Sequence, residues 1–183
     1  MTNFSFTDRK QIIDLIHETD DLEETNNIIQ ENEKLKKLRE PFYLNKQEFK
    51  KILLWKLRTQ HERQRKYREI NTDAIIQKIT RTAFEIDHPN WRYKTELKLN
   101  ILTVLRWVGI PVASAILALC NPKKYAVIDF RAFRQLSGKT KRAFSNRDYI
   151  EYLKKIRDIA KKYEVTPQQV DQAIWQYDIK MNG

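Results

Sequence analysis

The chain has 183 residues and a formal net charge of +11, from 35 Lys and Arg against 24 Asp and Glu. It is long enough to bury a core, and 41% hydrophobic and 11% aromatic residues argue against wholesale disorder. The single cysteine, Cys120, excludes disulfides and cysteine-ligated metal centres within the chain. The three histidines, His17, His61 and His88, are far apart and show no metal-ligand spacing.

The glycine content and the charge distribution indicate a fold class and a kind of partner. Only three glycines occur, so tight hairpins should be rare and an all-α fold is predicted. Residues 1–40 hold ten acids against six bases, net −4, whereas residues 41–183 hold 29 bases against 14 acids, net +15. We therefore expect an acidic helical arm, 1–40, before a basic helical body, 41–183. Nucleic acid is the leading partner for such a body; a membrane surface, an acidic protein or no polyanion at all are the alternatives.

Three helices are predicted in the first third of the chain. Thr7 can cap the first, and the polar, acidic segment after it predicts a second helix that Pro41 ends. Asn45 can cap a third, KQEFKKILLWKL. The run RTQHERQRKYRE, residues 58–69, has no apolar stripe. It is either a solvated face or loop, or a phosphate-contacting strip with Tyr67 among its bases.

Helices also fill the rest of the chain. DHPNWRY is predicted to be a loop, because Pro89 disfavours helix at the preceding residue, and a helix should follow from about Lys94. An apolar run then leads into the stretch LRWVGIPVASAIL, residues 105–117. The other predicted helix starts are Asn71 or Thr72, Ser145 or Asn146, and Thr166-Pro167.

The stretch at residues 105–117 has the pattern helix, short apolar turn, helix. We expect Gly109 to take a positive φ, and Pro111 suits the first turn of the second helix. The backbone amides at that helix start would point outward and could hold an anion, in a basic protein most simply a nucleic-acid phosphate. The local pattern alone favours an ordinary αα-hairpin.

The wider spacing adds a second motif. Here L-R-W-V-G-I-P-V-A, residues 105–113, is followed by V-I-D-F-R-A-F-R, residues 127–134, and Asp129 comes twenty positions after Gly109. Together with the loop NPKKYAV, these stretches resemble the HhH-GPD superfamily of endonuclease III-type DNA glycosylases, over about residues 98–136. Members read roughly L-P-G-V-G-x-K-x-A, then an apolar helix, then V-D-x-x-x-x-R. Trp107 stands where the family has its first glycine, and Pro111 where bifunctional members have their nucleophilic lysine.

The resemblance implies a two-lobed helical bundle with a helix-hairpin-helix motif at 98–120 and a helix beginning with the catalytic aspartate at 129–137. The implied activity is that of a monofunctional DNA glycosylase, a base-excision hydrolase that cleaves the N-glycosidic bond of a flipped-out damaged, mismatched or modified base. Proline cannot form a Schiff base, so lysine-dependent lyase activity is not expected. The alternatives are a non-catalytic helix-hairpin-helix DNA-binding protein and an interaction protein whose acidic arm pairs with its own body or a partner.

Asp129 has two interpretations. A carboxylate beside the sugar carbon stabilises the oxocarbenium-like transition state and can orient the attacking water, and such groups are typically worth about 10²–10³-fold. An aspartate before a helix is also very often an N-cap. One residue can perform both functions, and the glycosylase spacing favours the catalytic interpretation.

Further site residues follow from the resemblance and from the need to flip a base out of the duplex. Either Arg131 or Arg134 is expected to reach a backbone phosphate, with an internal ion pair as the alternative. Carbonyls of Thr103, Leu105 and Val108 would hold a structural monovalent cation. The predicted DNA-contacting residues of the hairpin are Trp107, Val108, Gly109, Ile110 and Val112, and the candidates for the base pocket are Trp55, Trp91, Tyr93, Tyr125 and Phe130.

The expected partner is double-stranded DNA, bound by a monomer that needs no other cofactor. No uninterrupted apolar span is long enough to cross a bilayer, and MTNFSFTDRK is not a secretory signal. We therefore expect a cytoplasmic, nucleoid-associated protein, acting in DNA repair or in defence against modified phage DNA. The motifs do not identify the excised base.

Overall fold

The computed structural model describes residues 5–58 and 69–182, and every regular element in these ranges is an α-helix. The predicted all-α fold is therefore confirmed for this part of the chain. The predicted phosphate-contacting strip, with Tyr67, lies almost entirely outside the described residues. The helices are α1 (Arg9–His17), α2 (Leu22–Leu38), α3 (Lys46–Leu57), α5 (Asp73–Glu85), α6 (Trp91–Leu102), α7 (Ile110–Cys120), α8 (Phe130–Ser137), α9 (Asn146–Tyr163) and α10 (Pro167–Asn182).

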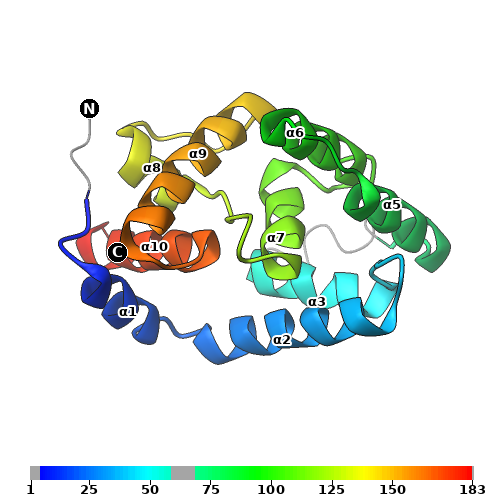
Figure 1. Cartoon of the computed structure of the whole chain (residues 1–183), viewed down its shortest axis with the longest axis horizontal. Coiled ribbons are helices and arrows are strands. Elements are labelled where there is room, and N and C mark those ends of the chain that lie inside the picture. Colours follow the sequence, from blue (N-terminus) through cyan, green and yellow to red (C-terminus); the bar gives the residue numbers. More distant parts are fainter. Residues whose placement is uncertain (1–4, 59–68, 183) are drawn as a thin grey trace.

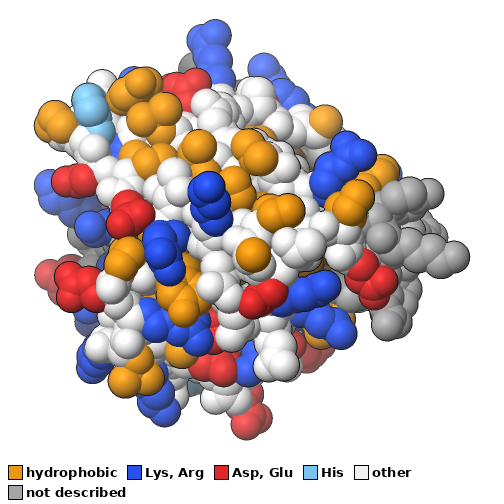
Figure 2. Space-filling model, turned by 90° about the vertical axis from the view of Figure 1, so that its right-hand side faces the viewer, with side chains coloured by type: hydrophobic (Ala, Val, Ile, Leu, Met, Phe, Trp, Pro, Cys, Tyr) orange, Lys and Arg blue, Asp and Glu red, His pale blue; other side chains and the backbone are white. Residues whose placement is uncertain are grey.

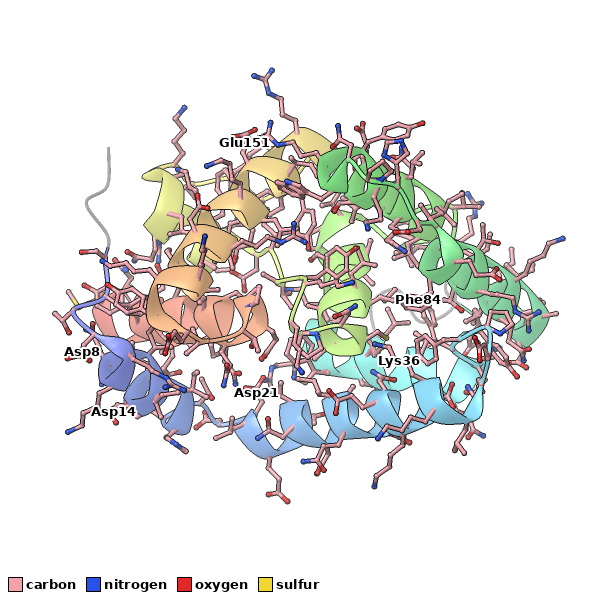
Figure 3. All side chains as sticks on the ribbon, in the orientation of Figure 1. Asp8, Asp14, Asp21, Lys36, Phe84 and Glu151 are labelled. Carbon is pink, nitrogen blue, oxygen red and sulfur yellow. The ribbon has the colours of Figure 1, made fainter. Side chains whose placement is uncertain are left out.

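Helix α7 lies at the centre of the molecule (Figure 1). Every residue from Val112 to Cys120 is buried, as expected for a helix that is apolar on all sides. Helices α2, α3 and α6 pack around it. Its last carbonyls are satisfied by side chains of α2: Asn32 Nδ2 donates to Leu119 at 3.2 Å, and Lys36 Nζ donates to Cys120 (Figure 3).

Helix α10 is the centre of a second group of helices. It packs against α1, α8 and α9, and Figure 1 shows these four helices together on the side of α7 opposite α5. Helices α3, α5 and α6 lie on the other side, and α6 also contacts α9. Buried side chains of α9 and α10, such as Leu153 and Ile174, belong to the same hydrophobic core as α7.

The acidic N-terminal segment is helical, as predicted, and contributes to this core. Ile12 and Ile16 of α1 and Ile28 of α2 are buried in it. Phe6 meets Tyr163 edge to face, with ring centroids 6.2 Å apart. Residues 5–40 therefore pack on the body, and removing them would expose its core.

The helix starts test the capping predictions. Asn45, Thr72 and Ser145 are N-caps, which confirms those assignments. Two others are wrong. Asp8, not Thr7, caps α1 by accepting from the Gln11 amide at 2.8 Å. Helix α6 begins at Trp91, before Lys94, because the Asn90 side chain accepts from the amides of Arg92 and Tyr93.

No helix in the described ranges combines the length and apolar character that crossing a membrane requires.

Candidate active site

A non-helical segment between α7 and α8 leads to Asp129, and polar side chains hold its amides. Val127 N–H donates to Asp171 Oδ2 at 2.6 Å, and Ile128 N–H donates to Ser114 Oγ at 3.1 Å. Both bonds are buried, so each satisfies a backbone group that would otherwise be costly to desolvate. The two residues before Asp129 are thus fixed from α10 and α7.

Two tyrosines of α9 hold the carbonyls of the same segment. Tyr149 Oη donates to Ala126 at 2.9 Å and Tyr152 Oη donates to Val127 at 3.0 Å. Burial raises the pKa of both hydroxyl groups far above the usual range for tyrosine, so both remain donors. The position of Asp129 therefore depends on α7, α9 and α10 together.

Asp129 uses its two carboxylate oxygens differently. Its extended backbone, with φ −144° and ψ 176°, places it as the N-cap of α8, and Oδ1 accepts from the Ala132 amide at 2.9 Å. Oδ2 lies 3.9 Å from Nζ of Lys56, which comes from α3. The side chain of Asp129 is 22% exposed and that of Lys56 12%. Asp129 is thus the N-cap of α8 through Oδ1, and its Oδ2 is available to the space in front of α8.

That space is a pocket between α3, α8 and α10. Its cavity volume is about 80 Å³, smaller than that of typical small-molecule sites. Two indoles, Trp55 of α3 and Trp175 of α10, lie among its walls with Asp129. The other lining residues are Asp21, Lys56, Arg58, Val127, Ala132, Gln168, Asp171 and Gln172.

Hydrogen bonds orient the polar walls of the pocket. Gln172 Nε2 donates to Thr19 Oγ1 at 2.9 Å, and Trp55 Nε1 donates to Thr25 Oγ1 at 2.8 Å. Arg58 and Asp21 form an ion pair, and Asp21 lies at the junction of α1 and α2 (Figure 3). The acidic N-terminal segment therefore supplies part of the pocket.

Asp171 is the most deeply buried ionisable group that lines the pocket. It is 7% exposed, and burial raises its pKa well above the usual range for a carboxyl group. The hydrogen bond from Val127 and the charge of Lys56 oppose this rise, whereas the charges of Asp129 and Asp21 add to it. Two of the three carboxyl groups that line the pocket thus have different surroundings: Asp129 lies beside a lysine, and Asp171 is shielded from water.

The turn before α7 differs from the sequence-based expectation. Gly109 has φ −91°, so the predicted positive φ at that residue is wrong. Trp107 instead has φ 63°, at the position where the HhH-GPD pattern has its first glycine, and its side chain is 49% exposed. Asn71 holds the turn by donating to the Arg106 carbonyl at 3.1 Å and accepting from the Arg106 amide at 3.0 Å.

Gly109 itself leaves the start of α7 bare. It is the N-cap of α7 but offers no capping side chain. A Cβ at Gly109 would meet only Pro111 Cδ, at an ordinary contact distance of 3.8 Å. Neither the backbone conformation nor the packing of the described chain therefore requires glycine here.

The predicted base-pocket aromatics are separated in space. Trp55 lines the pocket that holds Asp129. Trp91 and Tyr125 line a different hollow, where the Arg157 guanidinium lies 4.5 Å and 5.7 Å from their ring centroids. Tyr93 is half exposed and packs edge to face on His88.

Phe130 and its neighbouring arginines lie on α8. The Phe130 ring is 38% exposed and carries the Arg131 guanidinium at 5.3 Å from its centroid. Arg131 and Arg134 both bind Asp178, whose side chain is completely buried, at 3.2 Å and 2.6 Å. The internal ion pair, the alternative to phosphate contact, is therefore formed by both arginines. Their side chains remain 27% and 31% exposed, and contact with phosphate stays a prediction.

Sequence reasoning predicted only Trp55 and Asp129 of the residues that line the pocket, and it missed Lys56, Asp171 and Trp175 among others. Asp171 lies among the apolar residues Val170, Ala173 and Ile174 of α10, and an acid among such residues is a usable signal. Lys56 stands in an apolar run and carries no signal of its own. Which α3 side chain reaches Asp129 is decided only by the packing of α3 on α7.

Among the described residues, no group of three or more His, Cys, Asp or Glu side chains could hold a metal ion. The hairpin cation was expected on backbone carbonyls instead. One of these, Leu105, accepts from the Val108 amide at 3.1 Å within the turn. The cation at Thr103, Leu105 and Val108 stays an expectation.

Comparison of the chain with protein-family models, curated proteins and solved structures finds no match. The resemblance to the HhH-GPD superfamily therefore rests on the motif residues and their spacing.

Proposed function

We propose that the chain is a monofunctional DNA glycosylase with the two-lobed architecture of the HhH-GPD superfamily. The observation that carries the proposal is the position of Asp129. Its Oδ1 caps α8, while Oδ2 and Lys56 belong to a pocket that also contains two indoles. If Asp129 served only as the N-cap of α8, it would need neither Lys56 nor the pocket beside it.

In this proposal the pocket widens to receive a base that has left the duplex. Such a base needs a hollow and apolar faces on which to stack, and the indoles of Trp55 on α3 and Trp175 on α10 line the pocket. Helices α1, α8, α9 and α10 then form one lobe, the described helices α2, α3, α5, α6 and α7 belong to the other, and the base enters where the two lobes meet. Asp129 Oδ2 then faces the sugar carbon and stabilises the positive charge that develops there.

The start of α7 suits a DNA phosphate. Its amides carry partial positive charge and have no capping side chain, and Gly109 presents no Cβ to an approaching strand. The net charge of +15 over residues 41–183 favours such a partner. On the α5 side of the molecule, basic side chains are interspersed with acidic and apolar ones and form no continuous patch (Figure 2). The hairpin is therefore our candidate for the phosphate contact.

The decisive experiment is a search for released bases. Duplexes bearing a panel of lesions, mismatches and modified phage bases are incubated with the protein, and free bases are measured by mass spectrometry. We expect release of at least one base with an abasic site left in the strand. The second candidate is a non-catalytic DNA-binding protein, which the observed capping bond of Asp129 favours. DNA binding without release of any base would select it.

A further inference from the structure

Asp171 has an unusual position for a carboxyl group. It is 93% buried, lines the same pocket as Asp129, and uses Oδ2 to accept from Val127 N–H at 2.6 Å. No described residue donates a hydrogen bond to its other oxygen, Oδ1. A buried carboxylate oxygen without a donor is costly, whereas a protonated Oδ1 is itself a donor that can face the pocket.

The surroundings of Asp171 favour the protonated form. Asp21 and Asp129 line the same pocket and disfavour a further negative charge, whereas the hydrogen bond from Val127 and the charge of Lys56 favour it. Tyr152 of α9 is also close enough to interact electrostatically. Burial is the largest effect and raises the pKa of Asp171 well above its usual range, which favours the protonated form.

We propose that Asp171 is the general acid of the glycosylase reaction, donating the Oδ1 proton to a ring nitrogen of the departing base while Asp129 faces the sugar. This inference rests on the function proposed above. It gives the two carboxyl groups separate tasks, as in other glycoside hydrolyses, where an acid serves the leaving group and a carboxylate serves the sugar.

In the proposed step, Asp171 gives a proton to the base and water replaces the base at the sugar. The proton passes from Asp171 Oδ1 to the base, and the C1′–N bond breaks with its electron pair remaining on the base. The oxygen of a water molecule bonds to C1′ and loses one proton to Asp129, which releases it to solvent. Asp171 regains a proton from solvent, so both carboxyl groups return to their starting forms.

The proposal defines a class of substrate. A neutral base leaves as an anion unless it is protonated, so it needs the acid. A base that already carries a positive charge leaves as a neutral molecule and does not. The site therefore fits a neutral base with an unprotonated ring nitrogen.

The test compares two probes in otherwise identical duplexes: hypoxanthine, which is neutral, and N7-methylguanine, which is cationic. We expect Asp171→Asn to slow hypoxanthine release at least about 100-fold, the lower range for general acid catalysis, and to slow N7-methylguanine release only a few-fold if the wild type releases it. Asp129→Asn is the matched variant and should slow every base that the wild type releases. Equal losses for both probes in Asp171→Asn, or a wild type that releases only N7-methylguanine, would overturn the proposal.

Two measurements on the wild type keep the test valid if Asp171→Asn folds poorly. Hypoxanthine release should decline as the pH rises through the pKa of Asp171; a flat profile contradicts the role. Infrared spectroscopy at neutral pH should show a protonated carboxylic acid in the wild type that persists in Asp129→Asn; if Asp171→Asn folds, the signal should be absent from it. An ionised Asp171 overturns the proposal whatever the activity. A protonated Asp171 in a protein that releases no base would instead refute the glycosylase function, and with it the acid role.

Discussion

Lys56 Nζ on α3 lies 3.9 Å from Asp129 Oδ2 at the start of α8, while the other oxygen of Asp129 caps that helix. One carboxylate therefore joins two elements that are distant in sequence. Because each oxygen has its own partner, substitutions at Asp129 can separate the capping function from the function in the pocket.

Asp129→Asn preserves a capping side chain but removes the negative charge. Asparagine caps helices about as well as aspartate, so the free energy of unfolding should change little. Base release in single-turnover assays should fall by at least about two orders of magnitude, while DNA affinity persists or rises slightly. Asp129→Ala is the control for the cap and should cost roughly 1 kcal/mol of stability. A fully active Asp129→Asn protein would reduce Asp129 to a cap.

Product strands should remain intact until heat or alkali cleaves the abasic site, because Pro111 occupies the position of the family's nucleophilic lysine. Borohydride should trap no covalent protein–DNA adduct. Lys56 is the lysine of the described pocket, so it is the first amine to examine if an adduct forms. An adduct that Lys56→Arg abolishes would show lyase chemistry from a different position in the fold.

Gly109→Ala tests the bare start of α7. The φ of −91° and the space around Gly109 accept a methyl group, so the midpoint of urea unfolding should shift by less than the equivalent of about 1 kcal/mol. DNA affinity, measured by fluorescence anisotropy, should nevertheless fall several-fold because the methyl group keeps the strand from the amides. Val104→Ala, at a 62% exposed position before the turn, is the control. Unchanged affinity in Gly109→Ala would remove the hairpin from the interface.

Asp178 should make stability depend on pH. Burial alone would raise its pKa, but hydrogen bonds from Arg134, Gln135 and Arg131 outweigh this effect, and the pKa lies below the usual value. A group with a lowered pKa stabilises the fold above its unfolded value of about 3.9 and loses that contribution as the pH falls. Asp178→Asn should cost roughly 2 kcal/mol at neutral pH in urea unfolding and progressively less below about pH 4.

The exposed pair Lys154–Asp158 on α9 supplies the control for that experiment. Asp158→Asn should change stability by less than about 0.5 kcal/mol at any pH, since solvent screens such pairs. A loss in Asp178→Asn that stays constant with pH would mean that packing, not charge, explains the contribution of Asp178.

Duplex DNA binding should weaken steeply with salt, with a log–log slope of about −0.9 for each phosphate neutralised. Salt-insensitive binding would exclude a phosphate-dominated interface. Because residues 5–40 contribute to the core, their charge is better tested by substitution than by deletion. Exchanging the exposed Glu23 and Glu24 for Gln should tighten non-specific binding, and unchanged affinity would show that the acidic segment has no electrostatic influence on DNA.

The sequence by itself determined the helical class and several helix caps, and it singled out Asp129 as a candidate site residue. Helix periodicity and capping are local, so Asn45, Thr72 and Ser145 could be assigned from their neighbours. The spacing between Gly109 and Asp129 likewise lies within one continuous stretch, which is why a motif could point to it.

Only the tertiary structure decided which residues share the pocket. Lys56, Asp171 and Trp175 reach Asp129 from α3 and α10, and nothing in their local sequence specifies that meeting. The tertiary structure also decided that Trp107, and not Gly109, has the positive φ in the turn before α7. Asn71, from a different part of the chain, holds this turn through its hydrogen bonds to Arg106. Contacts between distant segments depend on how the apolar faces of whole helices pack around α7. A local pattern encodes a helix and its ends but not the neighbours that the helix acquires.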